Sequence, residues 1–171
     1  SLGEREELAT GLFRQALGVL GAIPKLDELI VVSMDRAVLD TASNNGARVL
    51  EEADQLSHSH SVEQGVAMAL GLGAQTVLSA AIDVPLATSA EYEELLDTAS
   101  HMSPRSLIIV PSLDGTGTNA LVRTPPDVIV SGFGPGSFER HINAGRGAGA
   151  EVRATRPLGL VLDLDTPEDL L

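Results

Sequence analysis

The sequence predicts an α/β fold, a three-layer sandwich with helices on both sides of a mainly parallel sheet. Short apolar runs alternate along the chain with segments of helical periodicity, as in folds of this class. The apolar runs are continuous, which is typical of parallel strands covered on both faces. The 171 residues are 43% hydrophobic and only 2% aromatic. We therefore expect a single domain over residues 1–171 with an aliphatic core.

Six helices are expected from apolar residues spaced three or four positions apart and from signals at the helix ends. Gly46 follows two asparagines and stops the second helix. Ser89 is the expected N-cap of the fourth, with acidic residues in its first turn. Pro167 lies in the first turn of the last helix. The expected ranges are 4–21, 38–45, 62–72, 89–100, 138–147 and 166–171.

Eight short apolar runs are interpreted as strands. They cover residues 27–33, 47–50, 76–82, 107–110, 120–123, 128–132, 152–155 and 160–164. A sheet covered on both faces buries such runs. We therefore expect Ile30, Val32, Val77, Leu78, Ile108 and Ile109 in the core.

Residues 51–61 are polar and lack periodicity, so a loop is expected there. The loop contains two histidines, His58 and His60, separated by one residue. Such a pair can chelate a metal ion, but no third ligand lies nearby in the sequence. A solvated loop is therefore the favoured interpretation, with a metal site as the alternative.

Charge and composition exclude several functional classes. The formal net charge of −13 at pH 7 argues against a nucleic-acid binder, which needs a basic surface. An acidic protein that binds nucleotides usually places a cation between carboxylate and phosphate, so Mg²⁺ is the expected cofactor. Cysteine is absent, which fits a reducing cytoplasm. No apolar run is long enough to cross a membrane, and no secretory signal is visible, so we expect a cytoplasmic protein without a membrane partner.

Two glycine turns, at residues 114–119 and 133–138, are candidate anion sites. Gly115 and Gly117 lack a β-carbon that would cover their amides, and so do Gly134 and Gly136. Ser137 falls at or near the N-cap of the following helix, where amides favour phosphate. The two turns together could hold one small phosphorylated acid. The alternative is that both are ordinary turns.

Three aspartates form a candidate metal site. Asp83 follows an apolar strand, and ligands of open α/β sheets bind at the carboxyl ends of strands. Asp163 and Asp165 lie two residues apart on an expected strand, and so on the same face. Converging carboxylates suit Mg²⁺. Alternatively, Asp83 closes a turn and Asp165 caps the last helix, but Asp163 interrupts an apolar strand without such a reason.

Three segments resemble the 2-phospho-L-lactate guanylyltransferases of coenzyme F(420) biosynthesis, a family with members that use phosphoenolpyruvate. They are VPSLDGTGTNAL at 110–121, FGPGSFERH at 133–141 and LVLDLDTPEDL at 160–170. The resemblance extends over roughly residues 8–171 and is strongest after Asp83. It implies a nucleotide-diphospho-sugar transferase-like (GT-A-like) fold. It also implies transfer of GMP from GTP to a small phosphorylated acid, with release of pyrophosphate.

The resemblance assigns roles to individual residues. The catalytic, metal-binding aspartates are Asp83, Asp163 and Asp165. The phosphorylated acid is held by Thr118, Gly134 and Ser137. Asn119 orients the turn or reaches a ligand. From its position one helical turn beyond Ser137 on the same face, His141 is expected to contact a phosphate or carboxylate, or else to be a partly exposed helix histidine.

The sequence departs from the family at its start, where a strand and a basic loop that serves the nucleotide phosphates precede the first helix. Neither is present in these 171 residues, so we expect a domain that lacks its first strand and phosphate loop. Alternatives are a related nucleotidyltransferase acting on a sugar phosphate or molybdopterin, and a non-catalytic phospho-acid-binding relic. The FG-x-G-SF turn argues against the former. Phospholactate, phosphoenolpyruvate and phosphoglycerate are not distinguished, and a homodimer is left open.

Overall fold

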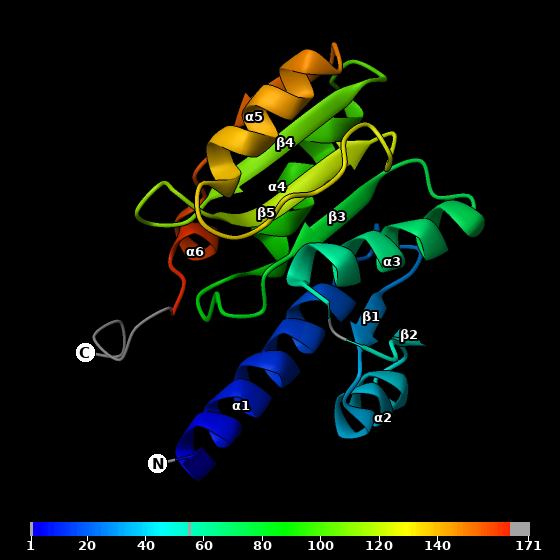
Figure 1. Ribbon diagram of the computed structural model, residues 1–171, viewed down its shortest axis with the longest axis vertical. Coiled ribbons are helices and arrows are strands. Elements are labelled where there is room, and N and C mark those ends of the chain that lie inside the picture. The colour runs from blue at the N-terminus through cyan, green and yellow to red at the C-terminus, as the bar shows by residue number, and fades with distance from the viewer. Residues whose placement is uncertain (1, 55, 165–171) are drawn as a thin grey trace.

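The computed structural model describes residues 2–54 and 56–164, in which helices and strands alternate (Figure 1). The helices are α1 (Leu2–Gly21), α2 (Arg36–Asn44), α3 (His58–Gly71), α4 (Ser89–Ser100), α5 (Ser137–Gly147) and α6 (Leu158–Val161). The strands are β1 (Ile30–Ser33), β2 (Arg48–Glu51), β3 (Val77–Ala80), β4 (Ser106–Pro111), β5 (Thr118–Thr124) and β6 (Glu151–Ala154). The helix expected at 166–171 lies outside the described residues.

The described strands form two sheets. β1 and β2 pair in parallel, and the other four strands form a sheet in the order β3-β5-β4-β6. β4 and β6 are parallel, whereas β5 runs antiparallel to both of its neighbours. The α/β fold is confirmed, with a mixed rather than a mainly parallel larger sheet.

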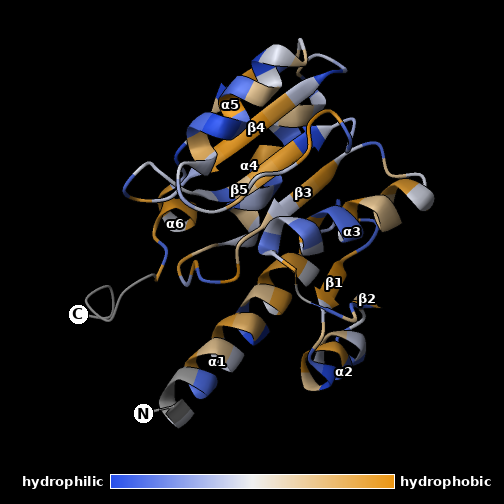
Figure 2. Ribbon diagram, viewed as in Figure 1, coloured by the Kyte–Doolittle hydropathy of each residue, from blue (hydrophilic) through white to orange (hydrophobic). Residues whose placement is uncertain are grey.

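The larger sheet is the middle layer of three, as predicted. Ile108 and Val110 of β4 pack with α4 and α6 in one buried cluster. Leu107 and Ile109 point to the other side and pack against α5. All four are buried, because successive side chains of a strand point to opposite faces and both faces are covered. The hydropathy colouring shows the resulting apolar strands between the helices (Figure 2).

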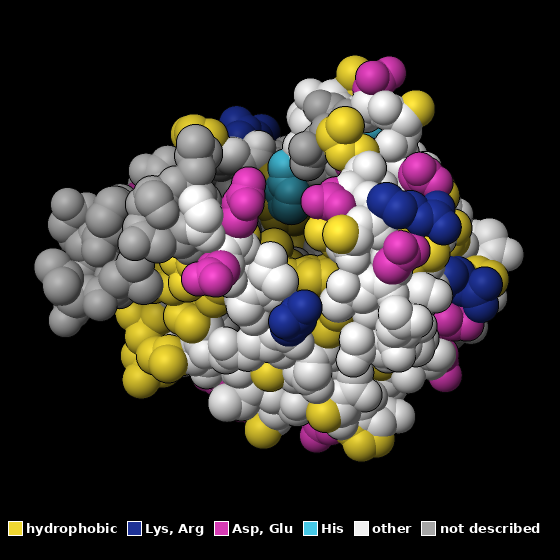
Figure 3. Space-filling model, turned by 90° about the horizontal axis from the view of Figure 1, so that it is seen from below, with side chains coloured by type: hydrophobic (Ala, Val, Ile, Leu, Met, Phe, Trp, Pro, Cys, Tyr) yellow, Lys and Arg dark blue, Asp and Glu magenta, His cyan; other side chains and the backbone are white. Residues whose placement is uncertain are grey.

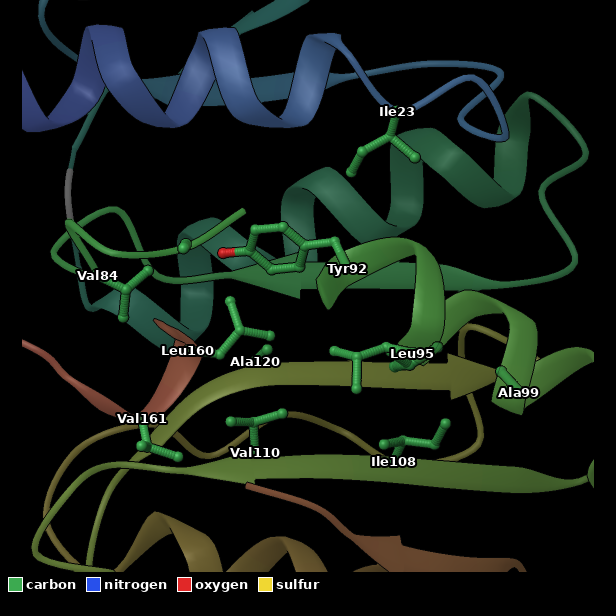
Figure 4. Close-up of a cluster of buried hydrophobic side chains, with 12 residues drawn as sticks. Ile23, Val84, Tyr92, Leu95, Ala99, Ile108, Val110, Ala120, Leu160 and Val161 are labelled. Carbon is green, nitrogen blue, oxygen red and sulfur yellow. The ribbon is translucent and has the colours of Figure 1, made fainter. Parts of the chain in front are cut away.

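Tyr92 lies within the cluster on the α4 side (Figure 4). Its side chain packs near Leu160 and Leu95 and is only 2% exposed. Burial raises the pKa of its phenol far above the usual value, and the negative charges of Glu91 and Asp83 act in the same direction. The phenol therefore stays neutral while the chain is folded.

Four of the six predicted core residues are only half-buried. Ile108 and Ile109 are in the core as predicted, whereas Ile30, Val32, Val77 and Leu78 line a large cavity. The reason lies in the sheet order: β1 and β3 are edge strands of their sheets, and both border this cavity.

Two predicted strands are wrong. Residues 128–132 form no strand, although Val128 and Ile129 are buried against the α5 side of the sheet. The run Leu160–Leu164 is not a strand either, because Leu160 and Val161 belong to the short helix α6, which begins after Pro157. Asp163 therefore follows a helix instead of interrupting a strand.

Helix α3 starts four residues earlier than predicted, and helix α4 starts where predicted but has a different cap. Helix α3 begins at His58, capped by Ser57, whose hydroxyl accepts a hydrogen bond from the His60 amide, so the predicted loop is shorter. Helix α4 is capped by Thr88 instead of Ser89, in a capping box with Glu91. No helix among the described residues is long and apolar enough to cross a membrane.

Candidate functional site

A cavity of about 2080 Å³ is bordered by β1 on one side and β3 on the other. The turns that follow β4 and precede α5 also line it, as does the start of α3. The space-filling view from below shows a hollow with acidic side chains and a histidine at its rim (Figure 3). The cavity therefore brings together segments that are far apart in the sequence.

Asp83 and Asp163 both line this cavity, and both are half-buried. Their segments are adjacent, because the Leu164 amide donates a 2.9 Å hydrogen bond to the Asp83 carbonyl. The Asp163 carboxylate accepts a hydrogen bond from the Leu113 amide at 3.4 Å. Asp165 lies outside the described residues. Within residues 2–54 and 56–164, no group of three histidine or acidic side chains is arranged as a metal site.

The first glycine turn uses its amides internally. The Gly115 amide donates to the Ser112 carbonyl at 2.9 Å, and the Gly117 amide donates to the Ser112 hydroxyl at 2.7 Å. Hydrogen bonds from Ser112 and Thr116 lower the pKa of Asp114 to about 2, so this exposed carboxylate stays charged. The expectation that these two glycine amides are open to an anion is therefore wrong, because the turn itself satisfies them.

The second glycine turn is more open. Gly134 and Gly136 have φ angles of 102° and 72°, values that favour glycine. An added β-carbon at Gly134 would have no atom within 4 Å, and Gly134 lines the cavity. The Phe138 amide donates to the Thr116 carbonyl at 3.1 Å. The two turns are thus joined at the cavity wall, and Gly136 takes the N-cap position of α5 next to Ser137.

Thr118, Ser137 and His141 form one hydrogen-bonded cluster beside the cavity. Thr118 lines the cavity, and its hydroxyl lies 3.0 Å from His141 Nδ1. The Ser137 hydroxyl donates to the Thr118 hydroxyl at 3.0 Å. The Gly132 amide donates to His141 Nε2 at 2.9 Å. His141 is only 1% exposed and is therefore neither a partly exposed helix residue nor open to a ligand.

Asn119 is buried, and its side chain holds helix α6 against β5. Its side-chain amide donates to the Leu160 carbonyl at 3.0 Å, which ties α6 to β5. Because Asp163 follows α6 after one residue, this bond helps to hold Asp163 at the cavity. Asn119 also lines the cavity.

Arg123 and Glu63 were not singled out from the sequence, yet they support the second glycine turn. The fully buried Arg123 guanidinium donates to Glu63 at 2.8 Å and to the Ile129 carbonyl at 3.2 Å. Glu63 also accepts from the Ser131 amide and hydroxyl. Burial raises the Glu63 pKa, but the hydrogen bonds from Ser131 and Arg123 outweigh it, and the net pKa is lowered. An arginine within the apolar run of β5 was the available signal.

His58 of the histidine pair packs against Phe133 of the second glycine turn. The His58 ring meets the Phe133 ring edge-on at 4.9 Å, and Phe133 meets His141 at 5.2 Å. The Ser59 hydroxyl accepts a 2.8 Å hydrogen bond from the Phe133 amide. These contacts connect the start of α3 to the turn, while His58 and His60 themselves stay exposed.

We expect His141 to remain neutral in the folded protein down to a pH of about 4. Burial is the main cause of its lowered pKa, with Arg123 and Arg140 acting in the same direction and Glu63 opposing them. In the unfolded chain this histidine has an ordinary pKa of about 6.5. Between a pH of about 4 and about 6.5, the unfolded chain therefore binds more protons at this position than the folded chain does. Stability should therefore fall by roughly 1–2 kcal/mol as the pH drops from about 6.5 to about 5.

Nuclear magnetic resonance titration of the His141 ring measures the pKa directly, and urea unfolding at both pH values measures the stability. Because carboxylates also titrate in this window, the His141→Asn variant is the control, and its pH dependence should be weaker. A ring midpoint near the ordinary value would contradict the prediction.

The chain matches one protein family over its whole length. The family model described as "Guanylyl transferase CofC like" matches residues 1–171. The chain is 35% identical over 167 residues to the phosphoenolpyruvate guanylyltransferase of Sphaerobacter thermophilus, covering 98% of this chain and 79% of that one. It is 31% identical over 170 residues to the 2-phospho-L-lactate guanylyltransferase of Methanothermobacter thermautotrophicus, covering 99% and 73%.

Among solved structures, a 4-diphosphocytidyl-2C-methyl-D-erythritol synthase is similar in fold. The TM-score is 0.70 at 16% sequence identity, and the match covers 93% of this chain and 86% of that one. This likeness confirms the predicted fold class.

Proposed function

The chain belongs to the family of CofC-like guanylyl transferases, and from this we propose that it joins GMP from GTP to a small phosphorylated acid. The observation that carries the proposal is the shared cavity. Asp83 and Asp163 border the same space as Thr118, Gly134 and Ser137. A triphosphate held at the aspartates would thus lie near an acid held at the turns. Its proposed setting is the biosynthesis of coenzyme F(420), in the cytoplasm.

The donor set fits Mg²⁺. Asp83 and Asp163 offer carboxylate oxygens from adjacent segments, and oxygen is the ligand type that Mg²⁺ prefers. We propose that these two residues, with Asp165 beyond the described part of the chain, hold the ion. When bound, Mg²⁺ would neutralise negative charge on the triphosphate.

For the transfer, the protein has to position the acid and GTP relative to each other. A phosphate oxygen of the acid forms a bond to the α-phosphorus of GTP, and the bond from that phosphorus to the oxygen of the departing pyrophosphate breaks. No covalent enzyme intermediate is required, since the two substrates react directly. The task of the second glycine turn and Thr118 is therefore to hold the acid within reach of the α-phosphate, where reacting atoms approach to about 3–3.5 Å.

Measurement of pyrophosphate release tests the proposal. The chain is mixed with GTP, Mg²⁺ and, in turn, phosphoenolpyruvate, 2-phospho-L-lactate and 3-phospho-D-glycerate. We expect release that requires GTP, Mg²⁺ and one of these acids, with CTP as the matched nucleotide control. Release with a sugar phosphate but with none of the acids would favour a related nucleotidyltransferase. Binding of an acid without release in any mixture would favour a non-catalytic binding domain.

A further inference from the structure

We propose that His141 is a positioning residue that fixes the Thr118 hydroxyl as a hydrogen-bond donor aimed into the cavity, for an anionic oxygen of the substrate acid. The inference rests on the proposed function for the identity of that anion. It gives His141 a role without ligand contact, since the buried ring does not line the cavity.

The Gly132 amide determines which ring nitrogen of His141 carries the proton. This amide donates to Nε2 at 2.9 Å, so Nε2 must have a free lone pair. A neutral imidazole carries one proton, which then lies on Nδ1. Burial and the positive charges of Arg123 and Arg140 disfavour a second proton, against the weaker opposing effect of Glu63.

The hydroxyl of Thr118 receives two hydrogen bonds. His141 Nδ1–H is 3.0 Å from Thr118 Oγ1, and the Ser137 hydroxyl donates to the same oxygen at 3.0 Å. A hydroxyl oxygen has two acceptor lone pairs, and both are now used. The Thr118 proton therefore has to point to a third direction. Because Thr118 lines the cavity, that direction is where an anion would sit.

Neighbouring side chains hold the His141 ring and Gly132 in place. Phe133 packs edge-on against the His141 ring at 5.2 Å, and Arg140 donates to the Gly132 carbonyl at 3.0 Å. The N–H and C=O groups of Gly132 are thus both hydrogen-bonded, which fixes the amide that makes Nε2 an acceptor. A donor that is already oriented loses little freedom when the anion binds.

The first experiment reads the protonation pattern. Isotope-labelled imidazole nitrogens of the unliganded protein should give shifts of a neutral ring with the proton on Nδ1. The exposed His101, substituted in His101→Gln, serves as the assignment control. A His141 ring protonated on Nε2 at neutral pH would overturn the inference, whatever the protein's activity.

The second experiment separates positioning from packing. Gln at position 141 keeps an acceptor for Gly132 but loses the donor for Thr118, whereas Asn keeps a donor near the Nδ1 position. In calorimetric titration, His141→Gln should weaken phosphoenolpyruvate binding by roughly 10-fold, and His141→Asn by less than about threefold. GTP binding should be unchanged in both.

The third measurement is a double-mutant cycle with Thr118→Val, which removes the hydroxyl. In that background His141→Gln should cause no further loss of phosphoenolpyruvate affinity, because the histidine acts through the threonine. Additive losses, or equal losses in the Gln and Asn variants, would refute the inference. If the wild-type chain releases pyrophosphate with the acid but His141→Gln binds it normally, only this inference fails. If the wild-type chain binds none of phosphoenolpyruvate, 2-phospho-L-lactate and 3-phospho-D-glycerate, the proposed function and the inference both fail.

Discussion

Replacing Asp163 with asparagine is expected to lower GTP turnover by on the order of 100-fold or more. Asparagine has the same shape and keeps an oxygen that can accept from the Leu113 amide, as Asp163 does at 3.4 Å. It removes the negative charge that the proposed Mg²⁺ site requires. Steady-state pyrophosphate release, with Mg²⁺ varied, measures the effect. Asp83→Asn should behave alike, because both carboxylates border the same cavity.

The matched control is Asp127→Asn, a neutralisation at an exposed aspartate that does not line the cavity. It should leave turnover within about twofold of the wild type, since isolated surface charges contribute little. The free energy of unfolding of Asp163→Asn should stay close to that of the wild type, because asparagine has the same shape and can accept the same hydrogen bond from Leu113. Wild-type turnover in Asp163→Asn would contradict the assignment of this aspartate.

Replacing Glu63 with glutamine is expected to destabilise the fold by about 2–3 kcal/mol, because the buried Arg123 loses its charged partner while Glu63 itself is 30% exposed. Arg123 has no exposed surface, and Glu63 is the carboxylate that balances its charge at 2.8 Å. Glutamine retains an oxygen for hydrogen bonding, so the loss reports on charge rather than on shape. Urea unfolding measures the change.

The exposed pair of Arg36 and Asp40 on α2 provides the comparison. Asp40→Asn should cost no more than about 0.5 kcal/mol, because water and salt screen exposed charges. The double variant Glu63→Gln with Arg123→Met should recover part of the lost stability, since no unpaired buried charge remains. If Glu63→Gln and Asp40→Asn cost equally little stability, the charge of Arg123 does not need Glu63 as its partner, and the prediction is wrong.

The alternation of helices and strands could be predicted because it depends on local periodicity, and so could the fully buried β4. The direction of β5 could not, because its apolar run reads the same in parallel or antiparallel pairing. The runs at 128–132 and at Leu160–Leu164 were misread for a related reason. A short buried run does not distinguish strand, helix or irregular chain. At 128–132, Arg123 and Glu63 bind the main chain in place of a strand ladder.

The candidate site was predictable in its residues and less so in its contacts. The glycine turns and Asp83 stand out in the sequence as turn and strand-end signals, and the structure places them at one cavity with Asp163. The sequence could not reveal that the carbonyl and hydroxyl of Ser112 accept hydrogen bonds from the Gly115 and Gly117 amides of the first turn. Nor could it reveal that His141 is buried behind Thr118, because that depends on where α5 packs.

Tyr92 can serve as an intrinsic spectroscopic probe of unfolding. The chain has this one tyrosine and no tryptophan, so one phenol dominates its near-ultraviolet absorption. That phenol lies in the buried cluster on the α4 side and does not line the large cavity. Because burial keeps it neutral, phenolate absorption at a pH of about 10 to 11, where an ordinary phenol ionises, accompanies loss of the core. The same signal follows unfolding of every variant named above without an added label.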